Sequence, residues 1–248
     1  MKKRLISLVV VTAMITTMFA GCGKKNDDTL IVGTEAAFAP YEYMVGDKVV
    51  GVDMDIAQAI ADNMGKKLVI KNMDFKGALL AVQKGTVDLV AAGVSVSPDR
   101  EKTMDFSEKY AKSMEVIIVN KTTPAVKGAS DDDLVGKIVG VQQGNIADTY
   151  VSGIETKEVK RYSKFAQAAQ DLKNNKIDCI VMDKIPGQDL VAANPELSML
   201  DGTLYEDEYA IAVKKGNKEL LDKVNTVIAE LKKNGKIDEF TDNHIGNK

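Results

Sequence analysis

The sequence predicts an α/β fold of two similar lobes, each built on a parallel sheet covered by helices. Short apolar strands alternate with helical segments along the chain, which is the order typical of such sheets. The chain also partly repeats itself. The helix–turn–strand pattern that runs from Phe75 to Asp88 recurs with the same spacing from Phe165 to Asp178. Two lobes of related structure are the simplest account of this repeat.

The elements of the first half can be assigned in order. Two segments flank Val45-Gly46-Asp47, which is a signal for a hairpin turn. Gly65 follows a helical pattern and marks its end. Apolar runs predict strands at 30–34, 68–70, 87–91 and 115–119, hairpin strands at 41–44 and 48–50, and helical spacing predicts helices at 56–64 and 75–83.

The second half begins after a linker near residues 120–130, where Pro124, Gly128 and polar residues cluster. Ile138-Val139-Gly140 is the counterpart of Ile31-Val32-Gly33 in the first strand. A last strand is expected at Tyr209–Val213. A long amphipathic helix is expected from Leu220 to Leu231, ending at Asn234-Gly235.

Composition limits the possible functions. The 248 residues are 45% hydrophobic and 28% charged, which suits a globular protein of one or two domains. A net charge of −3 gives no support to nucleic-acid binding. The sequence has one histidine and two cysteines and no phosphate-loop pattern, so no metal, cofactor or Ser-His-Asp chemistry is expected.

The N-terminus has the pattern of a secretory signal at residues 1–21. A basic start is followed by the apolar run Leu5–Phe19 and by small residues. Cys22 comes next, and the whole segment resembles a bacterial lipoprotein signal, which implies that this cysteine carries lipid such as palmitate. An ordinary cleavage site with an incidental cysteine is the alternative. Residues 22–29 are polar and are interpreted as a flexible tether.

The stretch from Ala91 to Arg100 is a candidate anion site. A strand end, Gly93 and Ser95 precede Ser97-Pro98-Asp99, which is typical of a helix start. Free N–H groups at a helix N-terminus favour an anion, and Arg100 could grip a carboxylate with two parallel hydrogen bonds. The alternative is a well-capped surface helix with a solvated arginine.

Six motifs in order resemble the solute-binding proteins of family 3, which are the polar amino-acid-binding proteins of bacterial ABC transporters. The resemblance covers about residues 30–240. The motifs are Gly33-Thr34-Glu35, Phe38-Ala39-Pro40-Tyr41-Glu42, Gly51-Val52-Asp53-Met54-Asp55-Ile56, Met73-Asp74-Phe75, the segment Ala92-Gly93-Val94-Ser95 to Arg100, and Met104-Asp105-Phe106-Ser107.

The resemblance implies a two-lobed, periplasmic-binding-protein-like type II fold with the ligand between the lobes. Two crossover strands are expected near 119–121 and 206–208. Lobe 1 is then discontinuous, with residues 30–118 and 209–248, and lobe 2 is formed by residues 119–208.

The resemblance also implies a clamp for an amino acid. Arg100 is expected to take the α-carboxylate, assisted by Ser95 and by the backbone at Gly93, which Ala92 precedes. Asp183 is expected to take the α-ammonium together with the backbone at Gly93. An arginine and an aspartate on opposite lobes suit a zwitterion, because each charge of the ligand meets a fixed opposite charge.

Other family positions concern the ligand side chain and closure of the cleft. Phe38 and Phe75 match aromatic positions that sandwich the side chain, and Glu35 matches an acidic position that reads its far end. The loop from Gln142 through Asn145 to Ile146 is expected to close the site from lobe 2. Ile146 replaces a small or hydroxyl residue of some relatives, so only its backbone N–H is expected to serve.

The expected function is that of a lipid-anchored, extracytoplasmic receptor that acts as a monomer. It would capture a polar L-amino acid by hinge closure and present it to the permease and ATPase subunits of an ABC importer. Glu35 and two rings favour arginine, lysine or histidine, with glutamine next. Two alternatives stay open, an enzyme on this fold (a dehydratase or glycan-cleaving type) and an amino-acid-sensing receptor domain. The latter needs a membrane span and a cytoplasmic module, and neither is found before Lys248.

Overall fold

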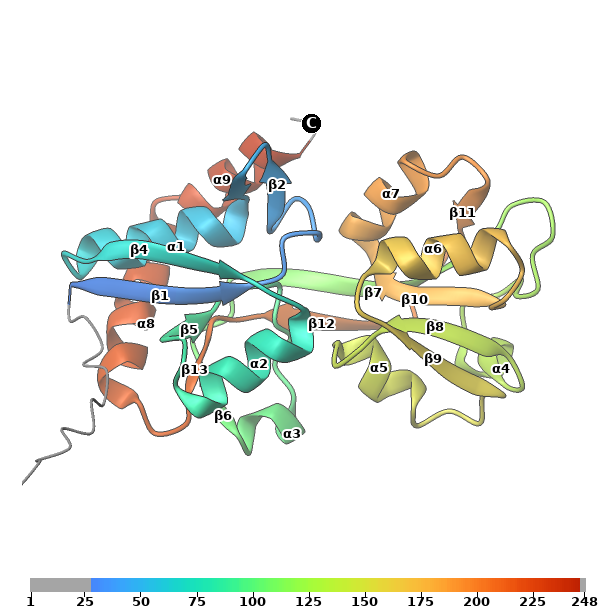
Figure 1. The fold of residues 1–248 in the computed structure, drawn as a ribbon, viewed down its shortest axis with the longest axis horizontal. Helices are drawn as coiled ribbons and strands as arrows, with labels where there is room; N and C mark the ends of the chain where they lie inside the picture. The colour runs from blue at the N-terminus through green and yellow to red at the C-terminus, as the bar shows by residue number, and fades with distance from the viewer. Residues whose placement is uncertain (1–27, 246–248) are drawn as a thin grey trace, which may run out of the picture.

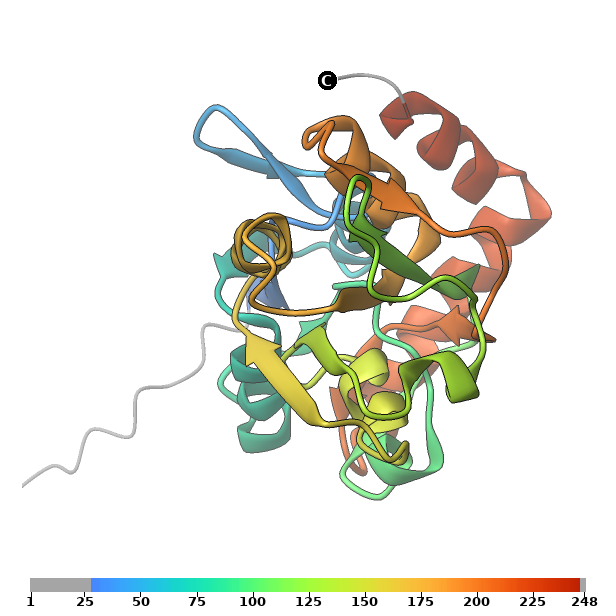
Figure 2. The same cartoon turned by 90° about the vertical axis from the view of Figure 1, so that its right-hand side faces the viewer.

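The computed structural model describes residues 28–245 and has two α/β lobes side by side, joined by two long strands (Figure 1). Figure 2 views the molecule from the side of the second lobe. The expected signal peptide and the expected lipidation site at Cys22 lie outside the described residues. None of the helices within 28–245 is long and apolar enough to cross a membrane.

The first lobe is built on a five-stranded sheet in the order β4-β1-β5-β13-β6. The pairs β1–β4 and β1–β5 are parallel, whereas β13 runs antiparallel to both β5 and β6. The sheet is therefore mixed and not wholly parallel, because β13 enters it from the far end of the chain. Its strands are β1 (Thr29–Thr34), β4 (Lys67–Asn72), β5 (Leu89–Val90), β6 (Met104–Phe106) and β13 (Ala212–Lys214), and the hairpin β2 (Tyr43–Val45) and β3 (Lys48–Val50) forms a separate ribbon.

The second lobe is built on a sheet in the order β11-β7-β10-β8-β9. Its central pairs β10–β8 and β8–β9 are parallel, and β7 runs antiparallel to β10 and β11. The strands are β7 (Ala111–Asn120), β8 (Ile138–Gln142), β9 (Glu158–Tyr162), β10 (Cys179–Asp183) and β11 (Leu197–Met199).

The lobes are joined by β7 and by β12 (Tyr205–Tyr209), which pair antiparallel over Ala111–Glu115. Beyond this ribbon, β7 continues into the second sheet, where Glu115–Ile118 pair with β10. These pairings place residues 115–118 on the second sheet, a few residues before the lobe boundary expected from the sequence. Figure 1 shows the ribbon running between the lobes.

Helices cover both faces of each sheet. In the first lobe α1 and α8 pack on one face and α2 on the other. In the second lobe the helices α5, α6 and α7 flank the sheet. The helices are α1 (Val52–Asn63), α2 (Phe75–Lys84), α3 (Pro98–Glu101), α4 (Asp131–Leu134), α5 (Ile146–Val151), α6 (Phe165–Lys173), α7 (Lys184–Ala192), α8 (Lys218–Lys233) and α9 (Lys236–His244).

The repeat seen in the sequence is a repeat in the structure. In lobe 1 the Asp88 carboxylate accepts the N–H of Ile31 at 2.8 Å, and in lobe 2 Asp178 accepts the N–H of Ile138 at 2.7 Å. The backbone N–H of each aspartate is returned to the carbonyl of the same isoleucine, at 2.7 and 2.8 Å. The same turn therefore joins the helix to the central strand in both lobes.

Two elements near the C-terminus differ from the sequence prediction. The last strand expected at Tyr209–Val213 is two strands, β12 and β13, because the chain leaves the connecting ribbon at Tyr209 and enters the first sheet at Ala212. After Gly235, which has a φ of 65°, a further helix (α9) follows where the prediction ended.

Gly51 joins the hairpin to α1 and holds the loop after β1 in place. The first N–H groups of α1 donate to that loop, Val52 to the Pro40 carbonyl at 3.1 Å and Asp53 to the Tyr41 carbonyl at 3.0 Å. Gly51 has a φ of 134°, and a Cβ there would lie 2.1 Å from the Tyr41 oxygen. Only glycine fits this approach.

Candidate ligand-binding site

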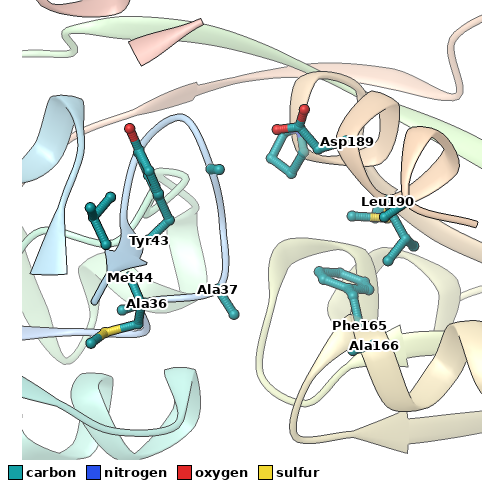
Figure 3. Close-up of a pocket in the computed structure, with 13 residues that line it drawn as sticks. Ala36, Ala37, Tyr43, Met44, Phe165, Ala166, Asp189 and Leu190 are labelled. Atoms are coloured by element: carbon teal, nitrogen blue, oxygen red, sulfur yellow. The ribbon is translucent and has the colours of Figure 1, made fainter. Parts of the chain in front are cut away.

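The predicted site residues lie between the lobes, beside a cavity of about 640 Å³. Figure 3 shows that one wall of the cavity comes from the hairpin and the loop after β1, and the other from α6 and α7. None of the predicted site residues lines it, but Phe165 contacts both the cavity and Phe38. The cavity therefore borders the predicted site on an apolar side. Its labelled lining residues are Ala36, Ala37, Tyr43, Met44, Phe165, Ala166, Asp189 and Leu190.

Arg100 is buried, with 9% of its surface exposed, and it contacts both lobes. Its Nη1 donates to the Ser95 carbonyl at 2.7 Å in lobe 1, and its Nη2 donates to the Gly144 carbonyl at 2.9 Å in lobe 2. The guanidinium lies over the ring of Phe75, 5.6 Å from its centroid. Burial lowers the pKa of Arg100. Three nearby carboxylates and Tyr205 act in the opposite direction and raise it. The arginine is thus the buried cation that an anionic ligand group would meet.

The helix that carries Arg100 is shorter than the sequence suggests. Ser97 caps α3 as predicted, accepting the Arg100 N–H at 3.4 Å, but the helix is a single turn of four residues. A single turn sums few peptide dipoles, so an anion here depends on the guanidinium and not on the helix.

The segment Ala92–Ser95 passes behind the site. The Gly93 N–H donates to the Asp53 carboxylate at 2.8 Å, so Gly93 can offer a ligand its carbonyl oxygen but not its N–H. A Cβ on Gly93 would lie 2.9 Å from the Phe38 ring. Ala92 is buried in the cluster around α2, and the buried Ser95 hydroxyl lies beside Asp207, whose pKa it lowers.

Asp53 is a buried residue that the sequence analysis did not place at the site. It also accepts the Tyr110 hydroxyl at 2.6 Å, and burial raises its pKa to about 6. Glu42 is fully buried beside it, and burial together with the Asp53 charge raises the pKa of Glu42. This shift favours the neutral form of Glu42, and Asp53 in turn accepts the Gly93 N–H.

Two predicted aromatic residues reach the site from different directions. Phe75 begins α2 and lies under Arg100, while Phe38 stacks on Phe165 of lobe 2 at 6.4 Å with a 26° angle between the rings. Phe38 also lies 6.5 Å from the ring of Tyr209. Phe165 was missed as a site residue, although the repeat aligns it with Phe75.

Glu35 follows β1 and is buried, with 3% exposed. Its Oε2 accepts from Nε2 of Gln142 across the cleft at 3.2 Å. Burial raises the pKa of Glu35, while the Gln142 hydrogen bond and the charge of Lys164 lower it. The carboxylate can therefore interact with a further donor or cation between the lobes.

At the helix end of the closing loop of lobe 2, the polar groups of Asn145 and Ile146 pair within the loop. Asn145 caps α5 by accepting the Ile146 N–H, and its amide donates to Gln142 at 3.4 Å. The Ile146 N–H, which we expected to serve the ligand, is therefore already paired. Among the described residues, two groups of this loop form hydrogen bonds to lobe 1: the Gln142 amide donates to Glu35, and the Gly144 carbonyl accepts from Arg100.

Asp183 ends β10 and is buried beside two hydroxyl donors of the connecting ribbon. It accepts the Ser113 hydroxyl at 2.6 Å and the Tyr209 hydroxyl as well. Two donors favour its ionised form, although burial raises its pKa. A carboxylate in this setting suits a cationic ligand group.

Two further acids, Glu115 on β7 and Asp207 on β12, converge on Asp183. One carboxylate oxygen of each residue lies within 4.8 Å of the other two. Sequence reasoning missed both, and its only signals were an acid within an apolar strand and an acid at an expected crossover. Three converging carboxylates are a donor set for a cation.

Residues that the sequence analysis proposed from both lobes thus meet at one place. Contacts that cross the cleft among the described residues include Arg100 with Gly144, Glu35 with Gln142, and Phe38 with Phe165. Asp183 lies near enough to Arg100 to influence its pKa. Ala92, Asn145 and Ile146 contribute burial and capping in the observed arrangement.

Comparisons with known proteins agree with this architecture. The chain is 32% identical to the arginine-binding extracellular protein ArtP of Bacillus subtilis, over 97% of this chain and 96% of that protein. A crystal structure of the substrate-binding protein AbpA of Streptococcus pneumoniae, bound to L-arginine, has a TM-score of 0.81 at 33% identity and covers 88% of this chain and 94% of its own. An ancestral arginine-binding protein bound to glutamine has a TM-score of 0.79 at 38% identity, covering 89% and 99%.

The match extends through both lobes. The model of the bacterial extracellular solute-binding proteins, family 3, covers residues 30–247, which includes both parts of lobe 1, the connecting ribbon and lobe 2. The chain therefore belongs to the bacterial extracellular solute-binding proteins of family 3.

Proposed function

We propose that the chain captures a polar L-amino acid between its lobes and delivers it to the permease and ATPase subunits of an ABC importer. Basic amino acids are the favoured ligands and glutamine is the next candidate. The chain acts as a monomeric binding protein and not as an enzyme. Ligand contacts to both lobes stabilise the closed arrangement, and this differential affinity drives closure.

The observation that carries this proposal is a buried cation facing buried carboxylates across one cleft. Arg100 suits the α-carboxylate, and Asp183 suits the α-ammonium. Each buried charge of the protein is compensated when the zwitterion lies between them.

The preference for a basic ligand rests on Glu35 and on the aromatic residues Phe38 and Phe75 of lobe 1. Glu35 is buried with one amide donor, so its carboxylate has capacity left for a cation or an amide. Relatives that bind arginine and glutamine support the same two candidates.

A thermal-shift screen against all natural L-amino acids tests the proposed function. A ligand that binds the folded state raises the apparent stability by about 2.7 kcal/mol when it is present at 100 times its Kd. We expect the largest rise in melting temperature with arginine, lysine, histidine or glutamine. No shift with any amino acid would contradict the proposal.

Glu35→Gln is expected to weaken binding of a cationic amino acid by about 1–3 kcal/mol, because a charged hydrogen bond becomes a neutral one. Glutamine serves as the internal control and should lose less, since the substituted amide oxygen can still accept its N–H. Competition calorimetry with arginine, lysine, histidine and glutamine measures both effects. Unchanged affinities and an unchanged order of preference would remove Glu35 as the specificity residue.

We further propose that a lipid on Cys22 anchors the protein to the outer side of the cell membrane. The proposal is supported by the small residues Ala20-Gly21 before Cys22 and by the polar tether after it. Cys22→Ala is expected to move the protein from the membrane fraction to the soluble fraction. Cys179→Ala is the control, because that thiol is buried in lobe 2 and should leave fractionation unchanged. A Cys22→Ala protein that remains with the membrane would argue against this anchor.

A further inference from the structure

Glu115 is a buried acid whose surroundings, within residues 28–245, offer an ionised carboxylate no hydrogen-bond donor. It is 0% exposed, on an otherwise apolar stretch of β7. Within the described part of the chain, neither of its oxygens meets an N–H or O–H donor. Asp183, within 4.8 Å, differs because it accepts two hydroxyls.

A buried carboxylate that has no hydrogen-bond donors is stable only in its neutral form when it lies beside a second carboxylate that accepts two hydrogen bonds. In its neutral form Glu115 has an O–H, and Asp183 is the acceptor beside it. Burial and the charges of Asp183 and Asp207 raise the pKa of Glu115 well above its usual value. Burial and the charge of Asp183 also raise the pKa of Asp207 to about 6, against the Ser95 hydrogen bond and the charge of Arg100, which lower it.

The remaining groups that face the cluster do not offset this crowding. Arg100 is a cation that acts on Glu115 and Asp207 and favours their ionised forms, but it does so against burial at both residues. The other titratable groups facing the cluster are acidic or phenolic, and they come from β12 and from the loop after β1: Tyr205, Glu208, Tyr209, Tyr41 and Glu42.

Several acceptors at the cluster are short of donors, and they come from different elements. Apart from the Ser95 hydroxyl beside Asp207 and a proton shared between Glu115 and Asp183, the carboxylate oxygens of Asp207 on β12 and Glu115 on β7 have no hydrogen-bond donor among the described residues. The buried Ser95 hydroxyl lies beside Asp207 from lobe 1. An ammonium group has three N–H donors and a positive charge, so it can satisfy acceptors from three elements at once.

We propose that Glu115 and Asp207 belong with Asp183 to the ammonium-binding part of the site, and that capture of the ligand ammonium displaces a proton from this cluster to the solvent. This inference rests on the proposed function, because it takes an amino acid as the ligand. It adds two ligand-site residues and makes binding dependent on pH.

Proton linkage sets the direction in which the ligand affinity changes with pH. The ligand ammonium stabilises ionised carboxylates, so the complex holds fewer protons than the free protein. Affinity then rises with pH while the free cluster is still protonated, by up to about tenfold per pH unit for one released proton, and becomes constant once the free cluster is ionised.

Calorimetry with L-arginine and with L-glutamine at pH 6, in two buffers of different ionisation enthalpy, counts the released protons. With the full chain we expect about one proton per bound ligand. The result should hold for glutamine as well as for arginine, because both carry the α-ammonium. Repeating the arginine titration with Glu35→Gln removes the other buried carboxyl that a cationic side chain could deprotonate.

The variants Glu115→Gln and Asp207→Asn should each reduce proton release and flatten the pH dependence, and the double variant should abolish release. The amide of Glu115→Gln can still donate to Asp183, so the local structure is retained. Glu206→Gln is the matched control for Asp207→Asn, since Glu206 precedes Asp207 on β12 and is exposed. It should release protons as the parent protein does.

Heats of binding that do not depend on the buffer in the unsubstituted protein would overturn the inference while leaving the proposed function intact. The same conclusion would follow if Glu115→Gln, Asp207→Asn and the double variant all released the full proton. Failure of arginine, lysine, histidine and glutamine to bind at all would overturn the proposed function for these ligands, and this inference with it.

Discussion

Arg100→Ala is expected to weaken amino-acid binding by roughly 30-fold or more while the protein remains folded. Removing one partner of a buried charge pair costs about 2–5 kcal/mol, because the ligand carboxylate is left without its counter-charge. The substitution also removes the hydrogen bond to Gly144, so lobe 2 loses one of its contacts to lobe 1. Titration calorimetry measures the affinity, and thermal unfolding confirms that the variant is folded.

Lys102→Ala is the matched control for Arg100→Ala. Lys102 follows the same short helix, but it is exposed, and its ion pair within residues 28–245 is with the exposed Asp99. Exposed ion pairs contribute little, so its removal should leave the affinity unchanged. A folded Arg100→Ala protein that binds like the parent would exclude the guanidinium from the ligand site.

The largest effect on stability is expected from Gly51→Ala. The new Cβ would lie 2.1 Å from the Tyr41 oxygen, and the backbone has a φ of 134° and a ψ of 173°, a region that is essentially restricted to glycine. Relief requires moving α1 away from the loop that carries Phe38. We expect the free energy of unfolding to fall by about 3–5 kcal/mol, at the upper end of single-substitution effects. Urea denaturation measures this loss.

Gly46→Ala separates the clash from the cost of a positive φ. Gly46 lies in the hairpin turn with a φ of 61°, and nothing lies within 4 Å of a Cβ built there. Its substitution should cost only about 1 kcal/mol. Similar losses at both positions would show that the close approach of the Tyr41 carbonyl is unimportant for stability.

Much of the fold could be predicted because short sequence patterns determine the individual helices, turns and strands. The helix–turn–strand units beginning at Phe75 and Phe165 have the same spacing, and each forms the same aspartate-capped turn in its own lobe. The split of the last strand could not be predicted, because the change of direction after Tyr209 depends on which sheet each half joins.

The site was predictable only where one short motif carries the chemistry. Arg100 follows a recognisable helix start, and its burial agrees with a role at the cleft. The pair Glu35 and Gln142 and the convergence of Glu115 on Asp183 depend on contacts between distant segments. The sequence does not distinguish a buried glutamate such as Glu115 from a glutamate on the surface. Its protonation could therefore not be recognised before its neighbours were known.

The position of β13 has a consequence for the order in which the chain can assemble. β13 lies between β5 and β6 in the first sheet, although it is made after every strand of the second lobe. As the polypeptide leaves the ribosome, the second lobe has all its strands by Tyr209, while β6 still lacks the neighbour that attaches it to the sheet. The lobe that begins first therefore finishes last, and truncation before Ala212 would leave the N-terminal lobe incomplete while sparing every strand of the other.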